Sequence, residues 1–314
     1  MRRYEIEINH GRLLSSPAIL VWRAVAFVSA RAIMRCMTMS FTTIIDVQTL
    51  AGHYTDPDWV IIDCRFDLLD KSVGRQHYQI AHIPDAVYAH LEEDLSVPMG
   101  PVGEGGRHPL PSPEQMMAVF GRFGIGQNTQ VVAYDDTSGH YAARLWWMLR
   151  FMGQDSVALL DGGWSAWQEA DLPVRSGTEQ SEPRDFVGMP RSDRLVLLDD
   201  VPDSRLLVDG RAPERYRGET EPIDPVPGHI PNAINRPYSL NWTEQGRWRS
   251  QENLLADYLT LLGETAPEDV VFYCGSGVSA CVNLVGMVRA GLPQGRLYVG
   301  SWSEWSRLKG TPHS

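Results

Sequence analysis

The sequence predicts an α/β protein built from two tandem copies of one domain, each a mostly parallel sheet flanked by helices on both faces. The main observation is an internal repeat, because four separate blocks recur at similar spacing along the chain. The recurring blocks are 60–63 with 206–209, 81–87 with 228–234, 131–135 with 270–274, and 163–167 with 301–305. A length of 314 residues also suits two domains better than one.

Within each copy, short apolar runs typical of strands alternate with patterns typical of helices. This alternation favours parallel strands joined by crossover helices. A helix is predicted after block 131–135 of the first copy and after the matching block 270–274 of the second. These helices are expected to end at Gly153 and at Gly291, because glycine commonly terminates helices. The pairs Trp164/Trp167 and Trp302/Trp305 have the spacing of one helical face, which indicates core or interdomain packing.

The repeat also sets the expected domain boundaries. We expect an N-terminal extension at 1–40, the first domain at 41–175 and the second domain at 195–314. Between them, residues 176–194 are rich in Ser, Pro, Gly and charged residues and are predicted to be the linker. The first copy is longer than the second, and its Pro/Gly-rich segment 98–113 is predicted to be an irregular loop that holds the additional residues.

The N-terminal extension has a composition of its own. Residues 8–39 contain several arginines but no acidic side chain, and Arg23 interrupts the apolar stretch 18–28. This pattern fits neither a secretory signal nor a membrane span. We expect a disordered extension, or a chain whose true start is Met37 or Met39.

Composition narrows the function classes. The chain is 43% hydrophobic and 21% charged, as in soluble globular proteins, and its net charge of -11 argues against a nucleic-acid partner. Its four cysteines include no C-x-x-C pair, so neither a disulfide framework nor a zinc site is expected. We therefore expect a cytoplasmic protein without a metal, working under reducing conditions and away from membranes.

Cys274 is the strongest candidate functional residue. It follows the apolar run 270–273 and opens a Gly/Ser-rich loop that leads into a helical stretch at 280–290. Backbone N–H groups at such an elbow, together with the positive end of the helix dipole, favour a thiolate over a thiol. Glycines at 275 and 277 let the backbone fold tightly enough for those N–H groups to converge. The remaining cysteines are predicted to be buried structural thiols, namely Cys36, Cys64 and Cys281.

Two chemistries use a cysteine held by backbone amides. Cysteine phosphatases need an arginine six positions after the nucleophile to clamp the phosphoryl oxygens. Here that position is Ala280, and the loop carries no basic residue, so this chemistry is disfavoured. A sulfur-accepting thiolate needs only a stabilised anion and room for one more sulfur atom, which the loop 274–279 can supply.

The duplicated Asp-x-Arg and His-Ile-Pro blocks and the loop Cys-Gly-Ser-Gly-Val-Ser resemble tandem rhodanese-fold sulfurtransferases over residues 41–314. The first copy has Asp135 where the second has Cys274, so only the second carries a thiol nucleophile. The resemblance is nearest to the 3-mercaptopyruvate sulfurtransferase group. Thiosulfate-using members place basic residues just after the nucleophile, where this chain has Gly275 and Ser276.

The resemblance implies that Cys274 takes a sulfur from 3-mercaptopyruvate as a persulfide, releasing pyruvate, without a cofactor. Cyanide, a small thiol or a thioredoxin-like protein would then accept the sulfur. Ser276, His82 and Asp63 would form a hydrogen-bonded chain that acts on the substrate thiol. Since His82 and Asp63 recur as His229 and Asp209, a purely structural role for them stays equally open.

Further residues are implied as a substrate-binding set. Arg215 matches the arginine that holds the substrate carboxylate in the family, a task that suits a guanidinium fork. The family usually has a second arginine about nine residues on, where this chain has Asp224, and Arg236 is predicted to replace it. The remaining members of the set belong to the cysteine loop: Gly275, Gly277, Val278 and Ser279.

Two alternative functions stay open. One is a thiosulfate:cyanide sulfurtransferase, and the other is a non-catalytic relay module that receives a persulfide from a partner protein and passes it on.

Overall fold

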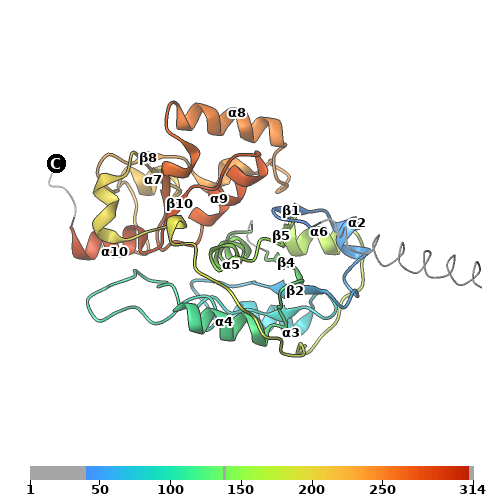
Figure 1. The fold of residues 1–314 in the computed structure, drawn as a ribbon. Helices are drawn as coiled ribbons and strands as arrows, with labels where there is room; N and C mark the ends of the chain where they lie inside the picture. The colour runs from blue at the N-terminus through green and yellow to red at the C-terminus, as the bar shows by residue number, and fades with distance from the viewer. Residues whose placement is uncertain (1–39, 137–138, 311–314) are drawn as a thin grey trace, which may run out of the picture. The chain divides into compact units, whose positions relative to one another are not determined.

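Two five-stranded sheets, one in each copy of the repeat, form the framework of the protein (Figure 1). All of their strand pairings are parallel. The first sheet has the spatial order β1 (Ile44–Ile45), β5 (Val157–Leu160), β4 (Gln130–Tyr134), β2 (Trp59–Asp63) and β3 (Val87–Tyr88). The second has the equivalent order β6 (Leu195–Val196), β10 (Arg296–Tyr298), β9 (Val270–Tyr273), β7 (Leu206–Asp209) and β8 (Ile234–Asn235). The predicted duplicated α/β fold is confirmed.

This structure is a computed structural model, and it describes residues 40–136 and 139–310. From Phe41 onward the chain belongs to one compact unit. The predicted N-terminal extension up to residue 39, including Cys36, lies outside the described residues. Within them, no helix combines the length and the apolar character that crossing a membrane requires.

Helices connect the strands in both copies. Those of the first copy are α2 (Val47–Ala51), α3 (Val73–Ile80), α4 (Pro113–Arg122), α5 (His140–Phe151) and α6 (Gly163–Glu169). Those of the second are α7 (Pro213–Tyr216), α8 (Gln251–Leu262), α9 (Ala280–Arg289) and α10 (Ser301–Leu308). Short 3₁₀ turns are η1 (Ser192–Arg194), η2 (Leu198–Asp203), η3 (Tyr238–Asn241) and η4 (Pro267–Asp269). The predicted linker contains η1, and its preceding residues 176–191, all described, form neither helix nor strand.

Helices cover both faces of each sheet because alternate strand residues point to opposite sides. In β2, Val60 and Ile62 belong to a core shared with α4 and α5, whereas Ile61 belongs to a second core shared with α2 and α6. The paired tryptophans fill the outer cores, as predicted, and Trp167 in α6 and Trp302 in α10 are fully buried.

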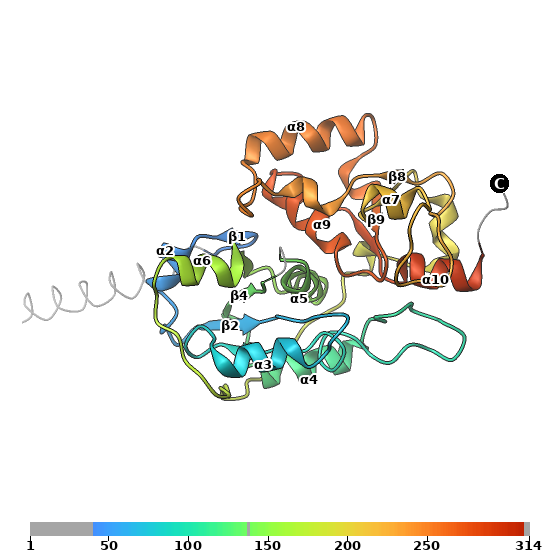
Figure 2. The same ribbon diagram turned by 180° about the vertical axis from the view of Figure 1, so that it is seen from behind.

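Helices α5 and α9 join the two copies. They pack against each other and lie side by side in both views (Figures 1 and 2). Their apolar residues form one continuous cluster that reaches from the first sheet to the second. Both helices end as predicted, because Gly153 and Gly291 adopt φ angles of 94° and 83° directly after the helix caps.

A buried ion pair follows the equivalent strand in each copy. Asp63 and Arg65 pair at 2.6 Å after β2, and Asp209 and Arg211 pair at 2.6 Å after β7. Each arginine also donates to a backbone carbonyl, Ala81 in the first copy and the corresponding Gly228 in the second. The repeated Asp-x-Arg block therefore fixes the segment that precedes each His-Ile-Pro block.

We expect Asp63→Asn to lower the free energy of unfolding by about 3 kcal/mol, because it leaves the buried Arg65 without its counter-charge. Urea denaturation followed by circular dichroism measures the change. Asp56→Asn is the matched control, since Asp56 pairs with His53 at the surface and should contribute less than about 1 kcal/mol. Equal stabilities of the two variants would contradict a structural role for Asp63.

Candidate active site

Cys274 lies at the elbow between β9 and the loop that leads into α9, where the sequence places it. The side chain is buried, with 2% of the residue exposed. Its backbone N–H donates to Ser301 Oγ at 3.1 Å, and its carbonyl accepts from the N–H of Trp302 at 3.0 Å. Two contacts with the start of α10 thus fix the backbone of the nucleophile candidate.

The rest of the loop keeps the backbone close to its neighbours. Gly277 has a φ of 71°, and any side chain on it would collide with the backbone carbonyl of Val299. Val278 is buried in the core, and Ser279 precedes α9 without capping it through its side chain. The loop therefore presents backbone and small side chains next to Cys274.

The first copy shows what this kind of loop binds. Asp135 occupies the position that Cys274 has in the second copy. Its carboxylate accepts hydrogen bonds from the N–H groups of Gly139, Tyr141 and Ala142 at 2.7–3.0 Å. The elbow of the first copy thus binds an anion that the chain itself supplies. The same fold elements surround Cys274, which supports the expectation of an anionic sulfur there.

Ser276 bonds to a histidine that the sequence analysis did not select. Its hydroxyl lies 2.8 Å from His108 Nδ1, and His108 Nε2 lies 3.6 Å from a carboxylate oxygen of Glu92. Burial, with further effects of Arg107 and Arg144, lowers the pKa of His108 to about 3. The imidazole is therefore neutral at physiological pH. With its proton on Nε2, toward Glu92, its Nδ1 can accept from Ser276.

The predicted chain through His82 and Asp63 is therefore wrong. His82 Nδ1 donates to the carbonyl of Tyr78 at 2.7 Å and its ring stacks on Tyr78, and His229 makes the same two contacts with Tyr216. Asp63 bonds to Arg65 and to Tyr134 rather than to a histidine. Both blocks recur because they maintain the fold in each copy.

Arg215 and Arg107 bring two guanidinium groups next to the cysteine loop. The space beside Gly275, where a larger residue would place its Cβ, is 3.1 Å from Arg107 Nη2 and 3.6 Å from Arg215 Nη2. Arg107 forms an ion pair with the buried Asp224, and Arg215 Nη2 lies 3.6 Å from the same carboxylate. Asp224, the apparent departure from the family, thus holds a second arginine that comes from the first copy.

Arg236 does not lie with this pair. Its guanidinium donates to Asn283 Oδ1 at 2.6 Å and lies 4.1 Å from the ring centroid of Tyr258, inside the second copy. The expectation that Arg236 supplies the second charge is therefore wrong, because its guanidinium is engaged by Asn283 and Tyr258, whereas Arg107 lies beside Gly275.

The loop 98–113 carries both residues that the sequence analysis missed, His108 and Arg107. It reaches the second copy, where Gly105 N–H donates to Glu304 at 2.6 Å and Arg107 N–H donates to Ser303 at 2.9 Å. Two features of the sequence could have pointed to this loop as part of the site. The first copy is longer than the second at this segment, and the Gly/Pro-rich stretch contains a histidine and an arginine.

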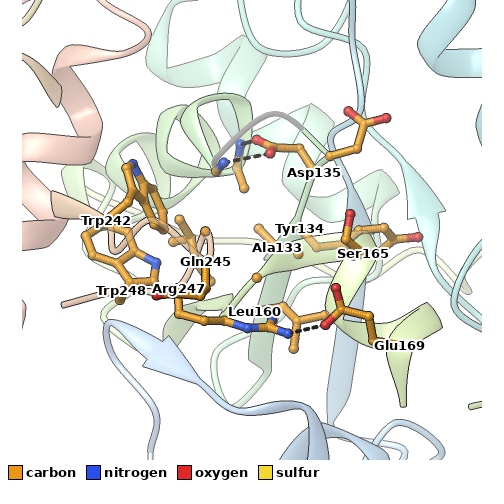
Figure 3. A pocket seen from close by; sticks show the side chains of 17 residues that line it. Ala133, Tyr134, Asp135, Leu160, Ser165, Glu169, Trp242, Gln245, Arg247 and Trp248 are labelled. Carbon is orange, nitrogen blue, oxygen red and sulfur yellow. Dashed lines mark hydrogen bonds and ion pairs between the residues drawn. The ribbon is translucent and has the colours of Figure 1, made fainter. Parts of the chain in front are cut away.

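A cavity of about 300 Å³ lies at the corresponding elbow of the first copy (Figure 3). It is lined by residues around Asp135 and by a hairpin of the second copy that includes Trp242, Arg247 and Trp248. Because Asp135 fills the anion position there and cannot act as a sulfur nucleophile, we do not assign the active site to this cavity. Within residues 40–136 and 139–310, no His, Cys, Asp and Glu side chains group in a way that could hold a metal ion.

A model of the rhodanese-like domain matches residues 46–170 and again 194–308. The chain belongs to the rhodanese family. Among its relatives, a Pseudomonas aeruginosa protein named as a probable 3-mercaptopyruvate sulfurtransferase is 44% identical over 275 residues, 85% of this chain and 96% of that protein. The 3-mercaptopyruvate sulfurtransferase of Escherichia coli K12 is 32% identical over 87% of this chain and 98% of its own length.

A solved structure gives the same family. The 3-mercaptopyruvate sulfurtransferase from Leishmania major superposes on this chain with a TM-score of 0.75 and 31% identity, covering 84% of this chain and 74% of that one. A Mycobacterium tuberculosis relative, named provisionally as a thiosulfate sulfurtransferase, is 36% identical over 84% of this chain and 93% of its own length.

The lowered pKa of His108 predicts a pH dependence of stability. Between its ordinary value of 6.5 and about 3, the unfolded chain binds a proton that the folded chain does not, so stability falls as the pH falls through this window. We expect His108→Asn to reduce the loss of unfolding free energy between pH 7 and pH 5 by up to about 2 kcal/mol. Urea unfolding at both pH values tests this. Equal losses in the wild-type protein and in His108→Asn would contradict the prediction.

Proposed function

We propose that this protein is a sulfurtransferase that moves sulfur from 3-mercaptopyruvate to a thiophilic acceptor through a persulfide on Cys274, releasing pyruvate. The observation that carries the proposal is the convergence of Cys274, the Ser276–His108 pair and two guanidinium groups around one loop. Relatives named for this activity at up to 44% identity, covering most of this chain, support it.

The first half-reaction follows from nucleophilic attack on sulfur. The Cys274 thiolate attacks the thiol sulfur of the donor, the C–S bond breaks, and its electron pair stays on the CH₂ carbon as the enolate of pyruvate. The thiol proton ends on that carbon. Ser276 donates a hydrogen bond to Nδ1 of the neutral His108, so its oxygen lone pairs are free to accept a hydrogen bond from the substrate S–H and to hold that thiol in place while its proton passes to the carbon.

The two arginines suit the carboxylate of the donor. A guanidinium fork binds a carboxylate through two parallel hydrogen bonds. Arg215 and Arg107 both reach the face of Gly275, one residue from the nucleophile, and the absence of a side chain on Gly275 leaves that face open. The carboxylate would therefore be held within reach of the loop while the thiol points toward Cys274.

The second half-reaction returns the enzyme to its starting state. The acceptor attacks the outer sulfur of the persulfide, the S–S bond breaks, and Cys274 leaves as a thiolate. With cyanide the product is thiocyanate, and a small thiol or a thioredoxin-like protein would take the sulfur in the same way. The three described cysteines are free, which suits a reducing compartment such as the cytoplasm.

Thiosulfate is the alternative donor. The observation in its favour is the Mycobacterium tuberculosis relative that is provisionally named as a thiosulfate sulfurtransferase. The cysteine loop itself has no basic residue. Both arginines beside it are paired with Asp224 or Glu221, so little net positive charge remains for a dianion. The relatives named as sulfurtransferases argue against the non-enzymatic alternative, a relay module that accepts persulfide only from a partner.

Steady-state rates with the two donors and cyanide separate these functions. We expect kcat/KM for 3-mercaptopyruvate to exceed that for thiosulfate by at least about tenfold, and a preference for thiosulfate would overturn the donor assignment. Intact mass after incubation with 3-mercaptopyruvate alone should show a gain of about 32 Da, one sulfur atom, which a relay module would not show. Cys274→Ser should abolish the mass gain and the turnover, whereas Cys64→Ser should retain both.

Arg107→Gln should raise KM for 3-mercaptopyruvate at least about tenfold with a smaller effect on kcat, because it removes one charged partner of the carboxylate. The discharge of a preformed persulfide by cyanide should proceed at the wild-type rate, since cyanide has no carboxylate. Arg217→Gln, at an exposed arginine paired with Glu219, is the control. An unchanged KM in Arg107→Gln would exclude Arg107 from the donor site.

A further inference from the structure

Arg144 is a buried cation without an acidic partner. It lies on α5 of the first copy with none of its surface exposed. Its guanidinium donates only to backbone carbonyls, those of Leu95 and His108 and that of Gly277 at 3.1 Å. In the described residues no carboxylate oxygen lies within 4.0 Å of it, since none of the ion pairs includes it.

A buried charge of this kind is costly unless an opposite charge compensates it. Burial lowers the pKa of Arg144, and the thiolate forms of Cys281 and Cys274 act in the opposite direction. An arginine nevertheless stays protonated at physiological pH, so the charge needs a partner. Two thiols belong to the segment that Arg144 contacts: Cys281 bonds to the same Gly277 carbonyl, and Cys274 lies three residues before Gly277 in the loop.

Of the two sulfurs, Cys281 is the poorer candidate. Burial raises the pKa of the Cys281 thiol far above its ordinary range, and the thiol donates to the carbonyl of Gly277 at 3.4 Å. Cys274 instead lies on the elbow whose counterpart in the first copy binds the carboxylate of Asp135. Cys274 is thus the group in this region that can ionise against Arg144.

Other charges around Cys274 do not take this role. Arg107 and Arg215 are compensated by Asp224 and Glu221. His108, behind Ser276, is neutral because its pKa is lowered to about 3. Burial raises the pKa of Tyr238, a further titratable group that interacts with Cys274, so its phenol is neutral too.

We propose that Arg144, a residue of the first copy, is the counter-cation that holds Cys274 as an anion, first as the thiolate and then as the persulfide. Arg144 does not touch the reacting atoms and acts as a positioning residue through its charge and through the Gly277 carbonyl. The thiolate half of this proposal is independent of the donor, and only the persulfide half rests on the proposed function.

The test is the pH dependence of Cys274 alkylation by iodoacetamide, with the labelled cysteine identified by peptide mass. In Arg144→Gln we expect the midpoint of the rate profile to move up by about one pH unit or more, so that about tenfold less Cys274 reacts at pH 7. Arg144→Lys, which keeps the charge but loses the fork, should stay near the wild-type midpoint. Arg150→Gln is the matched control, because Arg150 lies on the same helix and pairs with Asp155 at 3.2 Å.

A folded Arg144→Gln protein with the wild-type midpoint would overturn the proposal and leave Arg144 as a purely structural link between the copies. If that variant does not fold, Arg144→Lys decides, since a midpoint shifted upward by a unit despite the retained charge would also overturn it. The readout needs no sulfur donor. If the protein proves inactive with 3-mercaptopyruvate, the proposed function is refuted, but the alkylation profile still tests whether Arg144 stabilises the Cys274 thiolate.

Discussion

In the proposed function Cys274 reacts as an anionic sulfur, and an anion that is 2% exposed must be compensated by fixed dipoles and charges. The cysteine loop 274–279 carries no cation of its own. In our proposal the compensating cation comes from elsewhere in the fold: it is Arg144 of the first copy, which contacts the Gly277 carbonyl of the loop. Arg107 and Arg215 are paired with Asp224 and Glu221 and are assigned to the substrate carboxylate instead. The proposed site thus draws on both copies, which pack together through α5 and α9.

This division of labour explains why a copy without a nucleophile is retained. The first copy keeps the elbow but fills its anion position with Asp135, which closes that site to chemistry. Its contribution is made by the long loop 98–113, which delivers His108 and Arg107 to the second copy. In the proposed function the second copy therefore supplies the nucleophile, and the first copy supplies groups that act on the substrate.

The sequence predicted the fold, the repeat and the position of Cys274 because each depends on local patterns that recur in both copies. The same recurrence misled the choice of His82 and Asp63, since residues that recur at equivalent positions serve what the copies share, which is the fold. His108 and Arg107 lie in a segment without periodicity and without a counterpart. Their contacts join residues 168 and 117 positions apart, to Ser276 and Asp224, and no local pattern indicates such pairs.

Ser301 shows how far the second copy has been adapted around its cysteine. At the equivalent position the first copy has Gly163 with a φ of 56°, and Ser301 adopts nearly the same φ of 55° although it carries a side chain. A non-glycine residue in this region costs of order 1 kcal/mol or more. The serine hydroxyl accepts the N–H of Cys274 at 3.1 Å and donates to the carbonyl of Tyr298 at 2.9 Å, two bonds that glycine cannot make. The strained backbone of Ser301 at the start of α10 is therefore offset by hydrogen bonds that fix the backbone of Cys274.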